Sequence, residues 1–201
     1  MSDASRKEDE PVTLKLHVIL CSTRPGRVGA AVAHWAQAVA VEHGGFAVEL
    51  VDLAEIALPI YDEPRHPALR QYEHDHTKRW SASVASADAY LFVLPEYNGG
   101  TTPALVNALN YVYREWNYKP AAFVSYGGIS GGVRAVQFTR QLLVALKLVP
   151  IVEGVIIPMV AQHLDEQKRF KPGDIHPGAA KAMLDELVRW AEALKPMRAT
   201  T

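Results

Sequence analysis

Short runs of apolar residues alternate along the chain with longer segments whose apolar residues recur every three or four positions. The short runs predict β-strands and the longer segments predict α-helices, because side chains repeat every two residues in a strand and every 3.6 in a helix. Strands are expected at 16–21, 47–53, 89–94, 120–125 and 149–157, and helices at 28–43, about 72–86, 102–113, around 136–146 and 179–194. Five strands therefore alternate strictly with five helices.

This alternation predicts an α/β fold with a parallel, doubly wound sheet, because right-handed crossovers place helices over both of its faces. We expect the flavodoxin-like strand order 2-1-3-4-5. In that order, ligands bind outside the carboxyl ends of the strands, at the switch point between the first and third. The segment 56–72 contains three prolines and is expected to be an extended excursion.

The loop after the first strand reads Ser22-Thr23-Arg24-Pro25-Gly26-Arg27 and leads to a helix start near Val28 and Gly29. Hydroxyl groups, guanidinium groups and the N–H groups that open a helix together suit a phosphate monoester. The alternative interpretation is a turn with a side-chain N-cap and two solvated arginines.

Two further loops follow the third and fourth strands. Pro95-Glu96-Tyr97-Asn98-Gly99-Gly100 combines a rigid backbone with an aromatic side chain and amide groups, which suits a planar ring. The segment 125–132 contains four glycines, so its N–H groups can approach a ligand closely. Each loop alone is also compatible with an ordinary connection. All three lie on one edge of the predicted sheet, and together they predict a site for a phosphate-bearing ligand, FMN above all.

Composition and charge limit the classes of partner that we expect. The 201 residues fit one domain, and 21 basic against 22 acidic residues give a net charge of -1, which offers no field to attract nucleic acid or an anionic membrane. A lone cysteine, Cys21, excludes an internal disulfide and suits a reducing, cytoplasmic location. We expect a disordered tail at 1–13, one FMN-binding domain at 14–195 and a second tail at 196–201.

These three loops resemble those of the NAD(P)H-dependent FMN reductase family, a flavodoxin-like group that includes quinone, azo-compound and chromate reductases. The resemblance spans residues 14–194. The segment 22–27 is similar to the family's FMN-phosphate loop, and the tetrapeptide Pro95-Glu96-Tyr97-Asn98 is similar to its isoalloxazine loop. Ser125-Tyr126-Gly127-Gly128 resembles the third flavin contact.

The resemblance implies that Ser22, Arg24 and Arg27 hold the phosphate, while 96–99 and 126–128 frame the ring. It also implies a homodimer or homotetramer with the flavin beside a subunit interface. The excursion near 61–69 and an aromatic stretch would then line that interface. The stretch comprises Tyr111, Tyr113, Trp116 and Tyr118, for which half-buried helix packing is the alternative.

The expected function is transfer of a hydride from NADPH or NADH to bound FMN, and of two electrons from FMN to a quinone-like or other small acceptor. No acid or base side chain is named, because the cofactor carries the chemistry. A non-catalytic electron carrier or FMN-binding regulator is an alternative. Ser130, in a G-x-S-x-G sequence, offers a serine hydrolase as a further alternative, but that leaves the first two loops unexplained.

No metal site is expected. His74 and His76 are two residues apart and would not share a helix face, and no further ligands cluster nearby in the sequence. This segment is interpreted as a solvated helix start.

Overall fold

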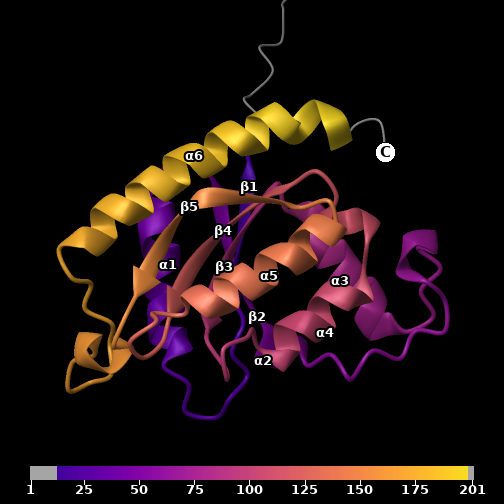
Figure 1. Ribbon diagram of the computed structural model, residues 1–201. Helices are drawn as coiled ribbons and strands as arrows, with labels where there is room; N and C mark the ends of the chain where they lie inside the picture. The colour runs from indigo at the N-terminus through magenta and orange to yellow at the C-terminus, as the bar shows by residue number, and fades with distance from the viewer. Residues whose placement is uncertain (1–12, 199–201) are drawn as a thin grey trace, which may run out of the picture.

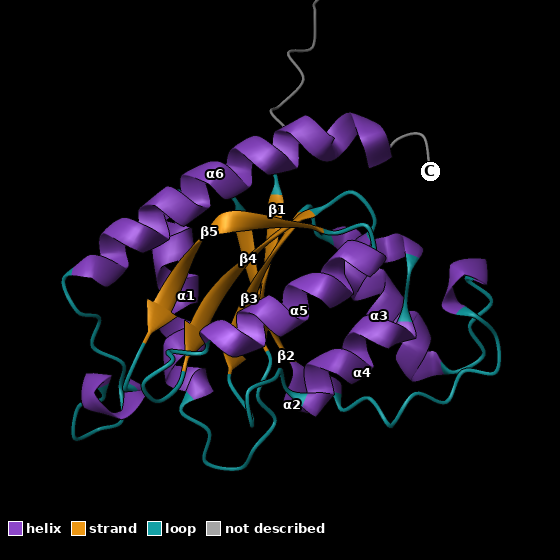
Figure 2. Cartoon of the chain, viewed as in Figure 1, coloured by secondary structure: helices purple, strands orange, loops and turns teal. Residues whose placement is uncertain are grey.

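Five parallel strands form the centre of the computed structural model, which describes residues 13–198 (Figures 1 and 2). They are β1 (Lys15–Leu20), β2 (Ala47–Asp52), β3 (Ala89–Pro95), β4 (Pro120–Tyr126) and β5 (Val149–Ile157). The strand order is β2-β1-β3-β4-β5, which confirms the flavodoxin-like order. Of the tails expected at 1–13 and 196–201, residues 1–12 and 199–201 lie outside the described residues.

Helices cover both faces of this sheet, as the crossover rule requires. They are α1 (Gly29–His43), α2 (Leu53–Ile56), α3 (Asp75–Ser86), α4 (Pro103–Tyr111), α5 (Val133–Ala145) and α6 (Ile175–Arg198). Helices α1 and α6 pack on one face in one apolar cluster, and α3, α4 and α5 pack on the other in a second cluster. Short 3-10 helices occur at Pro67–Leu69, Arg114–Trp116 and Val160–His163.

Burial explains the continuous apolar runs at 89–94 and 120–125, since every residue of β3 and β4 is buried. The second cluster also holds the largest fully buried side chains, with the Trp80 and Trp116 rings 5.9 Å apart. Both indoles are satisfied there, because Trp80 Nε1 donates to Ala108 O at 2.9 Å and Trp116 Nε1 to Leu109 O at 3.3 Å. Tyr111 and Trp116 are therefore core residues of their own chain, and the packing alternative holds for these two aromatics.

The helix ends differ from prediction mainly at the C-terminus. Helix α6 begins at Ile175 instead of 179 and continues to Arg198, so residues 196–198 belong to the helix and not to a tail. Both ends of the helix include a proline. Pro177 lies in the first turn, where its missing N–H costs nothing, and Pro196 lies in the last turns, where one hydrogen bond is lost without ending the helix.

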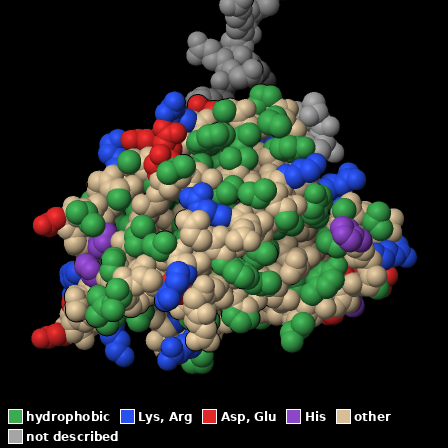
Figure 3. All heavy atoms as spheres, viewed as in Figure 1, with side chains coloured by type: hydrophobic (Ala, Val, Ile, Leu, Met, Phe, Trp, Pro, Cys, Tyr) green, Lys and Arg blue, Asp and Glu red, His purple; other side chains and the backbone are tan. Residues whose placement is uncertain are grey.

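The surface carries charges of both signs between apolar side chains, as Figure 3 shows for one face. This agrees with the near-neutral net charge of -1. Within residues 13–198, no helix has the length and apolar character needed to cross a membrane.

Candidate functional site

The first loop leaves the start of α1 open to a ligand. Neither Ser22 nor Thr23 caps the helix: its N-cap is Val28, which makes no side-chain capping bond. The turn with a side-chain cap, proposed above as the alternative, is therefore wrong. The first N–H groups of α1 have no intrahelical partner, and they point out of the carboxyl edge of the sheet with the positive end of the helix dipole. Thr23 and Arg24 are exposed beside them.

Arg27 does not extend freely into this space. Its guanidinium forms an ion pair with Asp52 at the end of β2, and the two side chains are only 19% and 11% exposed. The other carboxylate oxygen of Asp52 accepts from Ala54 N at 2.9 Å and so caps α2. Asp52 was missed by the sequence analysis, although its place at the carboxyl end of a strand was a usable signal. The positive charge of Arg27 is thus partly neutralised and fixed in position.

Hydroxyl groups from all three loops meet behind the first loop. Ser22 Oγ lies 3.0 Å from Tyr97 Oη, and Ser22 is 2% exposed. Tyr126 lies under the start of α1, where a Cβ on Gly29 would overlap its hydroxyl. Burial raises the pKa of Tyr126 well above its ordinary value of 10, and the hydrogen bond from Ser22 opposes this only in part. Tyr126 therefore stays a neutral hydroxyl at physiological pH.

The second loop is a tight turn whose backbone is held by two hydrogen bonds. Tyr97 and Gly100 exchange N–H···O bonds of 2.9 Å each, with Asn98 and Gly99 between them at φ of +51° and +79°. Asparagine and glycine are the residues that adopt this left-handed conformation most readily. The turn holds Asn98 and Gly99 at the edge of the sheet as a rigid unit.

Glu96 was expected to frame a ring, but its carboxylate faces α5. It accepts from Ser130 Oγ at 2.8 Å and from Arg134 Nε at 2.6 Å, and its side chain is 7% exposed. The hydrogen bonds from Arg134 hold the pKa of Glu96 below its usual range. Arg134, which no sequence signal indicated, thereby ties the second loop to the third.

The third loop turns through glycines 131 and 132, whose φ angles are +59° and +87°. A Cβ on Gly132 would lie 2.9 Å from the backbone nitrogen of Tyr126, so the loop folds back tightly onto β4. Gly128 has open space around it. Ser125 lies near the end of β4, but its buried hydroxyl has no hydrogen-bond partner among the described residues and borders a cavity of about 140 Å³ between α5 and β5.

Two threonines after the second loop were also missed by the sequence analysis. Thr102 Oγ1 donates to Cys21 O at 2.8 Å and accepts from Leu105 N, which joins β1 to the start of α4. Thr101 Oγ1 is buried without a hydrogen-bond partner in the described chain. An unpaired buried hydroxyl is costly. A ligand with a polar edge beside the second loop would satisfy Thr101.

Cys21 lies at the edge of this site but is not a redox group. It is fully buried, and burial raises the pKa of its thiol well above the ordinary value. A thiol that stays protonated is a poor nucleophile. Cys21 is therefore a packing residue of the core.

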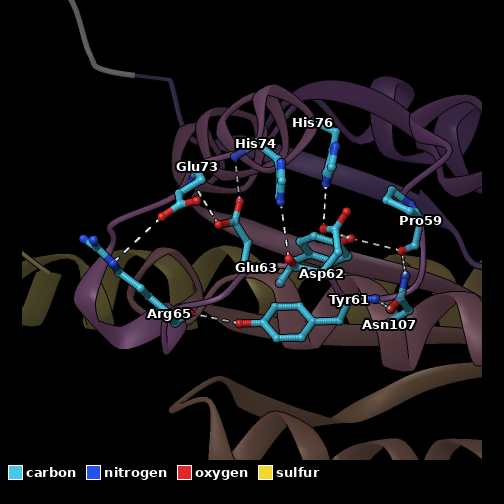
Figure 4. Close-up of polar contacts among 10 residues, drawn as sticks. Pro59, Tyr61, Asp62, Glu63, Arg65, Glu73, His74, His76 and Asn107 are labelled. Atoms are coloured by element: carbon cyan, nitrogen blue, oxygen red, sulfur yellow. Dashed lines mark hydrogen bonds and ion pairs between the residues drawn. The ribbon is translucent and has the colours of Figure 1, made fainter.

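The excursion after α2 is held to the helices by a polar network (Figure 4). His76 Nε2 lies 3.0 Å from Asp62 Oδ1 and His74 Nε2 lies 3.3 Å from the Asp62 carbonyl oxygen, while Tyr111 donates to the same carboxylate. The two imidazoles stack with centroids 5.1 Å apart. The helix start expected for this segment is confirmed, because His74 is the N-cap of α3. The two histidines are not simply solvated, however, since both contact Asp62 of the excursion.

The assembled edge suits a phosphate-bearing ring. It offers an uncapped helix N-terminus, exposed Thr23 and Arg24 and two glycine-bearing turns, and Thr101 supplies a hydroxyl that lacks a partner. None of the described residues form a group of three or more His, Cys, Asp or Glu side chains suited to a metal ion. The geometry can bind and orient a cofactor, and its two groups of shifted pKa are held in place, Glu96 by Arg134 and Tyr126 beneath the start of α1.

Comparisons with known proteins agree with this geometry. A family model described as NADPH-dependent FMN reductase matches residues 14–162. The chain is 38% identical over 187 residues to an NAD(P)H-dependent FMN reductase of Nectria sp, covering 90% of this chain and 89% of the relative. It is 31% identical over 146 residues to a probable NADPH:quinone oxidoreductase of Oryza sativa, covering 69% and 68%.

A solved structure supports the fold independently. FerB, a flavoenzyme NAD(P)H:(acceptor) oxidoreductase from Paracoccus denitrificans, aligns with a TM-score of 0.71 at 21% identity, covering 90% of this chain and 98% of that one. At this identity the likeness concerns the fold. The family model and the Nectria relative, each matching most of the chain, show that this protein belongs to the NADPH-dependent FMN reductase family.

Proposed function

We propose that the protein is a NAD(P)H-dependent flavin oxidoreductase that binds FMN across its three loops and reduces a quinone-like or other small acceptor. When bound, FMN supplies the chemistry of accepting a hydride and passing on two electrons. The observation that carries the proposal is the open N-terminus of α1 beside two rigid turns at the switch point of the sheet. The rice relative favours a quinone-like acceptor.

The first loop would hold the phosphate. The N–H groups that open α1 near Val28 and Gly29 would donate to it, and Ser22, Thr23 and Arg24 would add hydroxyl and charge-assisted hydrogen bonds. Arg27 would contribute less than a free guanidinium because it is shared with Asp52. Its fixed charge would still favour an anion at this edge.

The other two loops would frame the ring. Backbone groups of 96–99 and of 126–128 would bond its polar edges, and Pro95 would keep the loop at the end of β3 rigid. Thr101 Oγ1, which has no partner in the described chain, would find one there. Ser125 would contribute through its backbone only, since its side chain faces α5.

The hydrolase alternative is tested by Ser130→Ala. Ser130 donates its hydroxyl to Glu96, so its oxygen is not held by a histidine base. Glu96 keeps Arg134 in the variant. We expect NADPH-dependent flavin reduction within twofold of the wild type and a loss of about 1 kcal/mol in the free energy of unfolding. A reductase-active variant that loses an esterase activity present in the wild type would contradict this reading.

The proposed function is tested by spectroscopy. The protein is loaded with FMN, desalted and mixed with NADPH without oxygen. Retained flavin absorbance that bleaches on addition of NADPH, and returns on addition of a quinone, is the expected result. Retained absorbance that does not bleach would favour the carrier or regulator, and no retained flavin would contradict the proposal.

The phosphate assignment predicts a loss of affinity in Arg24→Gln. One charge-assisted hydrogen bond contributes about 1.5–3 kcal/mol, so we expect FMN to bind at least tenfold more weakly. Arg189→Gln, on the exposed surface of α6, is the matched control and should leave the affinity unchanged. Riboflavin lacks the phosphate, and its affinity should not differ between Arg24→Gln and the wild type. Equal weakening of FMN and riboflavin would contradict a phosphate role.

We also propose a homodimer or homotetramer in which the excursion lies at the interface. Ile60 and Leu69 support this, because they are 89% and 60% exposed on that segment. Sedimentation of the double variant Ile60→Asp and Leu69→Asp should show a smaller species than the wild type. A reducing, cytoplasmic location is proposed from the lone buried Cys21.

A further inference from the structure

A groove of about 520 Å³ adjoins the three-loop site and shares part of the first loop with it. One side is formed by the first loop and the exposed flank of α1, and the other by a turn that follows β5, at residues 164–170. Both segments lie toward the carboxyl edge of the sheet (Figure 1). Residues 26–28 belong to the groove and to the loop assigned to the phosphate. The groove is therefore a continuation of the cofactor site.

The groove combines an apolar surface with a cationic rim. Val28, Ala31 and Leu164 are partly buried apolar residues in it. The Trp35 ring packs on Phe170, with centroids 5.1 Å apart, and both side chains line the groove. The cationic or titratable lining residues are Arg27, His34, Lys168 and Arg169, and the lining contains no acidic residue. Aromatic and apolar surface suits a heterocyclic base, and the rim suits a phosphate.

Charge pairing in the turn leaves Lys168 unmatched. Asp165 accepts from Arg169 Nε at 2.9 Å and lies 3.7 Å from Lys171 Nζ, so this carboxylate serves the two neighbouring cations. Among residues 13–198, Lys168 has no ion pair, and its side chain makes no hydrogen bond. An unmatched cation on the rim of a groove favours an anionic ligand.

The backbone places Lys168 at this rim by a strained conformation. Its φ is +59°, in the left-handed region, although it is not glycine. The turn imposes this conformation, because Lys168 N donates to Asp165 O at 2.8 Å and Arg169 N donates to Asp165 Oδ1 at 2.8 Å. Left-handed backbone is unfavourable for a residue that carries a Cβ. Glycine at 168 would avoid this cost but would remove the cation from the rim.

We propose that this groove binds the adenosine 2′-phosphate half of NADPH, with Lys168 selecting the 2′-phosphate and so favouring NADPH over NADH. This rests on the proposed function, since a dinucleotide whose nicotinamide lies against the flavin must place its other half outside the three loops. The groove is contiguous with the phosphate loop and has the matching chemistry for that half. The adenine lies on the apolar side near Trp35, and the 2′-phosphate lies at the cationic rim.

The kinetic test compares Lys168→Ala with Lys171→Ala in the FMN-loaded enzyme. Lys171 is a matched control because it is exposed, lies three residues away and does not line the groove. For Lys168→Ala we expect the KM for NADPH to rise about tenfold with kcat unchanged. The KM for NADH should stay within twofold, and so should both KM values of the control. Equal effects on both donors, or none, would overturn the proposal.

A binding test separates the groove from the redox reaction. Adenosine 2′,5′-bisphosphate and 5′-AMP are titrated calorimetrically into the wild type and Lys168→Ala. The bisphosphate should bind the wild type at least tenfold more tightly than 5′-AMP, and the variant should lose this preference while retaining FMN. If the wild type shows no preference, the proposal fails even where NADPH bleaches the flavin. If the preference is present but no donor bleaches the flavin, the proposed function fails and the anion site remains.

A second copy of the chain is the competing occupant of the groove. Lys168→Glu would then change the sedimentation coefficient, whereas nucleotide binding predicts no change. A shift in oligomeric state with unaltered discrimination between NADPH and NADH would assign the groove to a subunit contact and overturn the proposal.

Discussion

Gly29→Ala should weaken FMN binding by about 10- to 100-fold and lower the free energy of unfolding by about 1–3 kcal/mol. The added Cβ would overlap Tyr126 Oη and would lie 3.0 Å from Leu20 Cδ1. Overpacking of this kind typically costs about 1–3 kcal/mol, because a buried neighbour must leave its preferred position. Tyr126 is 5% exposed and borders the proposed ring site, so its displacement would disturb the flavin as well as the core. Fluorescence titration with FMN and denaturant unfolding measure the two effects.

Gly178→Ala is the matched control. Gly178 lies in the first turns of α6 with nothing within 4 Å of an added Cβ. Alanine is a better helix former than glycine by up to about 1 kcal/mol, so this variant should be as stable as the wild type or more so. Its FMN affinity should be unchanged.

A double variant identifies the cause of the Gly29 effect. Tyr126→Phe removes the hydroxyl that the new Cβ would overlap, so Gly29→Ala should cost less in that background. We expect the two changes to be non-additive by about 1 kcal/mol or more, as is usual for residues in contact. Strict additivity would show that the alanine acts through the helix backbone and not through Tyr126.

The sheet could be predicted from the sequence because its signals are local. Buried central strands appear as continuous apolar runs, and β5 was predicted at the bounds that the structure shows. The strand order was then inferred from alternation and handedness, and it is confirmed. The last helix was predicted too short, because no apolar periodicity marks residues 196–198. A proline is tolerated in the first turn and costs little near a frayed end, so Pro177 and Pro196 lie within the helix.

The loops of the site could be located from the sequence, but their side-chain directions could not. Arg27 and Asp52 are 25 residues apart, and Glu96 and Arg134 are 38 apart. Each pair forms only because neighbouring strands end on the same edge of the sheet. From residue type alone, Arg27 and Glu96 were expected to face a ligand. In the folded chain each of them instead forms an ion pair, Arg27 with Asp52 and Glu96 with Arg134. The backbone turns and the uncapped helix are local features, and these were recognised.

At the opposite edge of the sheet, Lys119 should make stability depend strongly on pH. Its side chain is 6% exposed, and Nζ donates to Val84 O at 2.8 Å and to Ala85 O at 3.1 Å, the carbonyls that end α3. Burial lowers the pKa of Lys119 from 10.5 to about 7, because no carboxylate contacts its amine among the described residues. A depressed amine pKa favours the unfolded state wherever the unfolded chain binds the proton and the folded chain does not.

The sign of the effect follows from the two pKa values. Between about pH 7 and 10.5, unfolding takes up a proton at Lys119, so the free energy of unfolding rises with pH by up to about 1.4 kcal/mol per pH unit. From pH 7.5 to 9.5 the contribution of Lys119 to this free energy should rise by about 2–3 kcal/mol. Lys119→Met should abolish this gain. Urea unfolding of the apoprotein at the two pH values measures it.

The difference between the two pH values is the decisive quantity, because Lys119→Met changes the stability at any one pH in two opposing ways. It removes the cost of burying an ionisable amine, but it leaves Ala85 O without this donor, which costs about 1–3 kcal/mol, whereas Val84 O keeps the hydroxyl of Tyr90. Lys195→Met, on the exposed surface of α6, should keep the pH dependence of the wild type. If Lys119→Met keeps it too, Lys119 is charged in the folded protein throughout this range, and water must reach its amine.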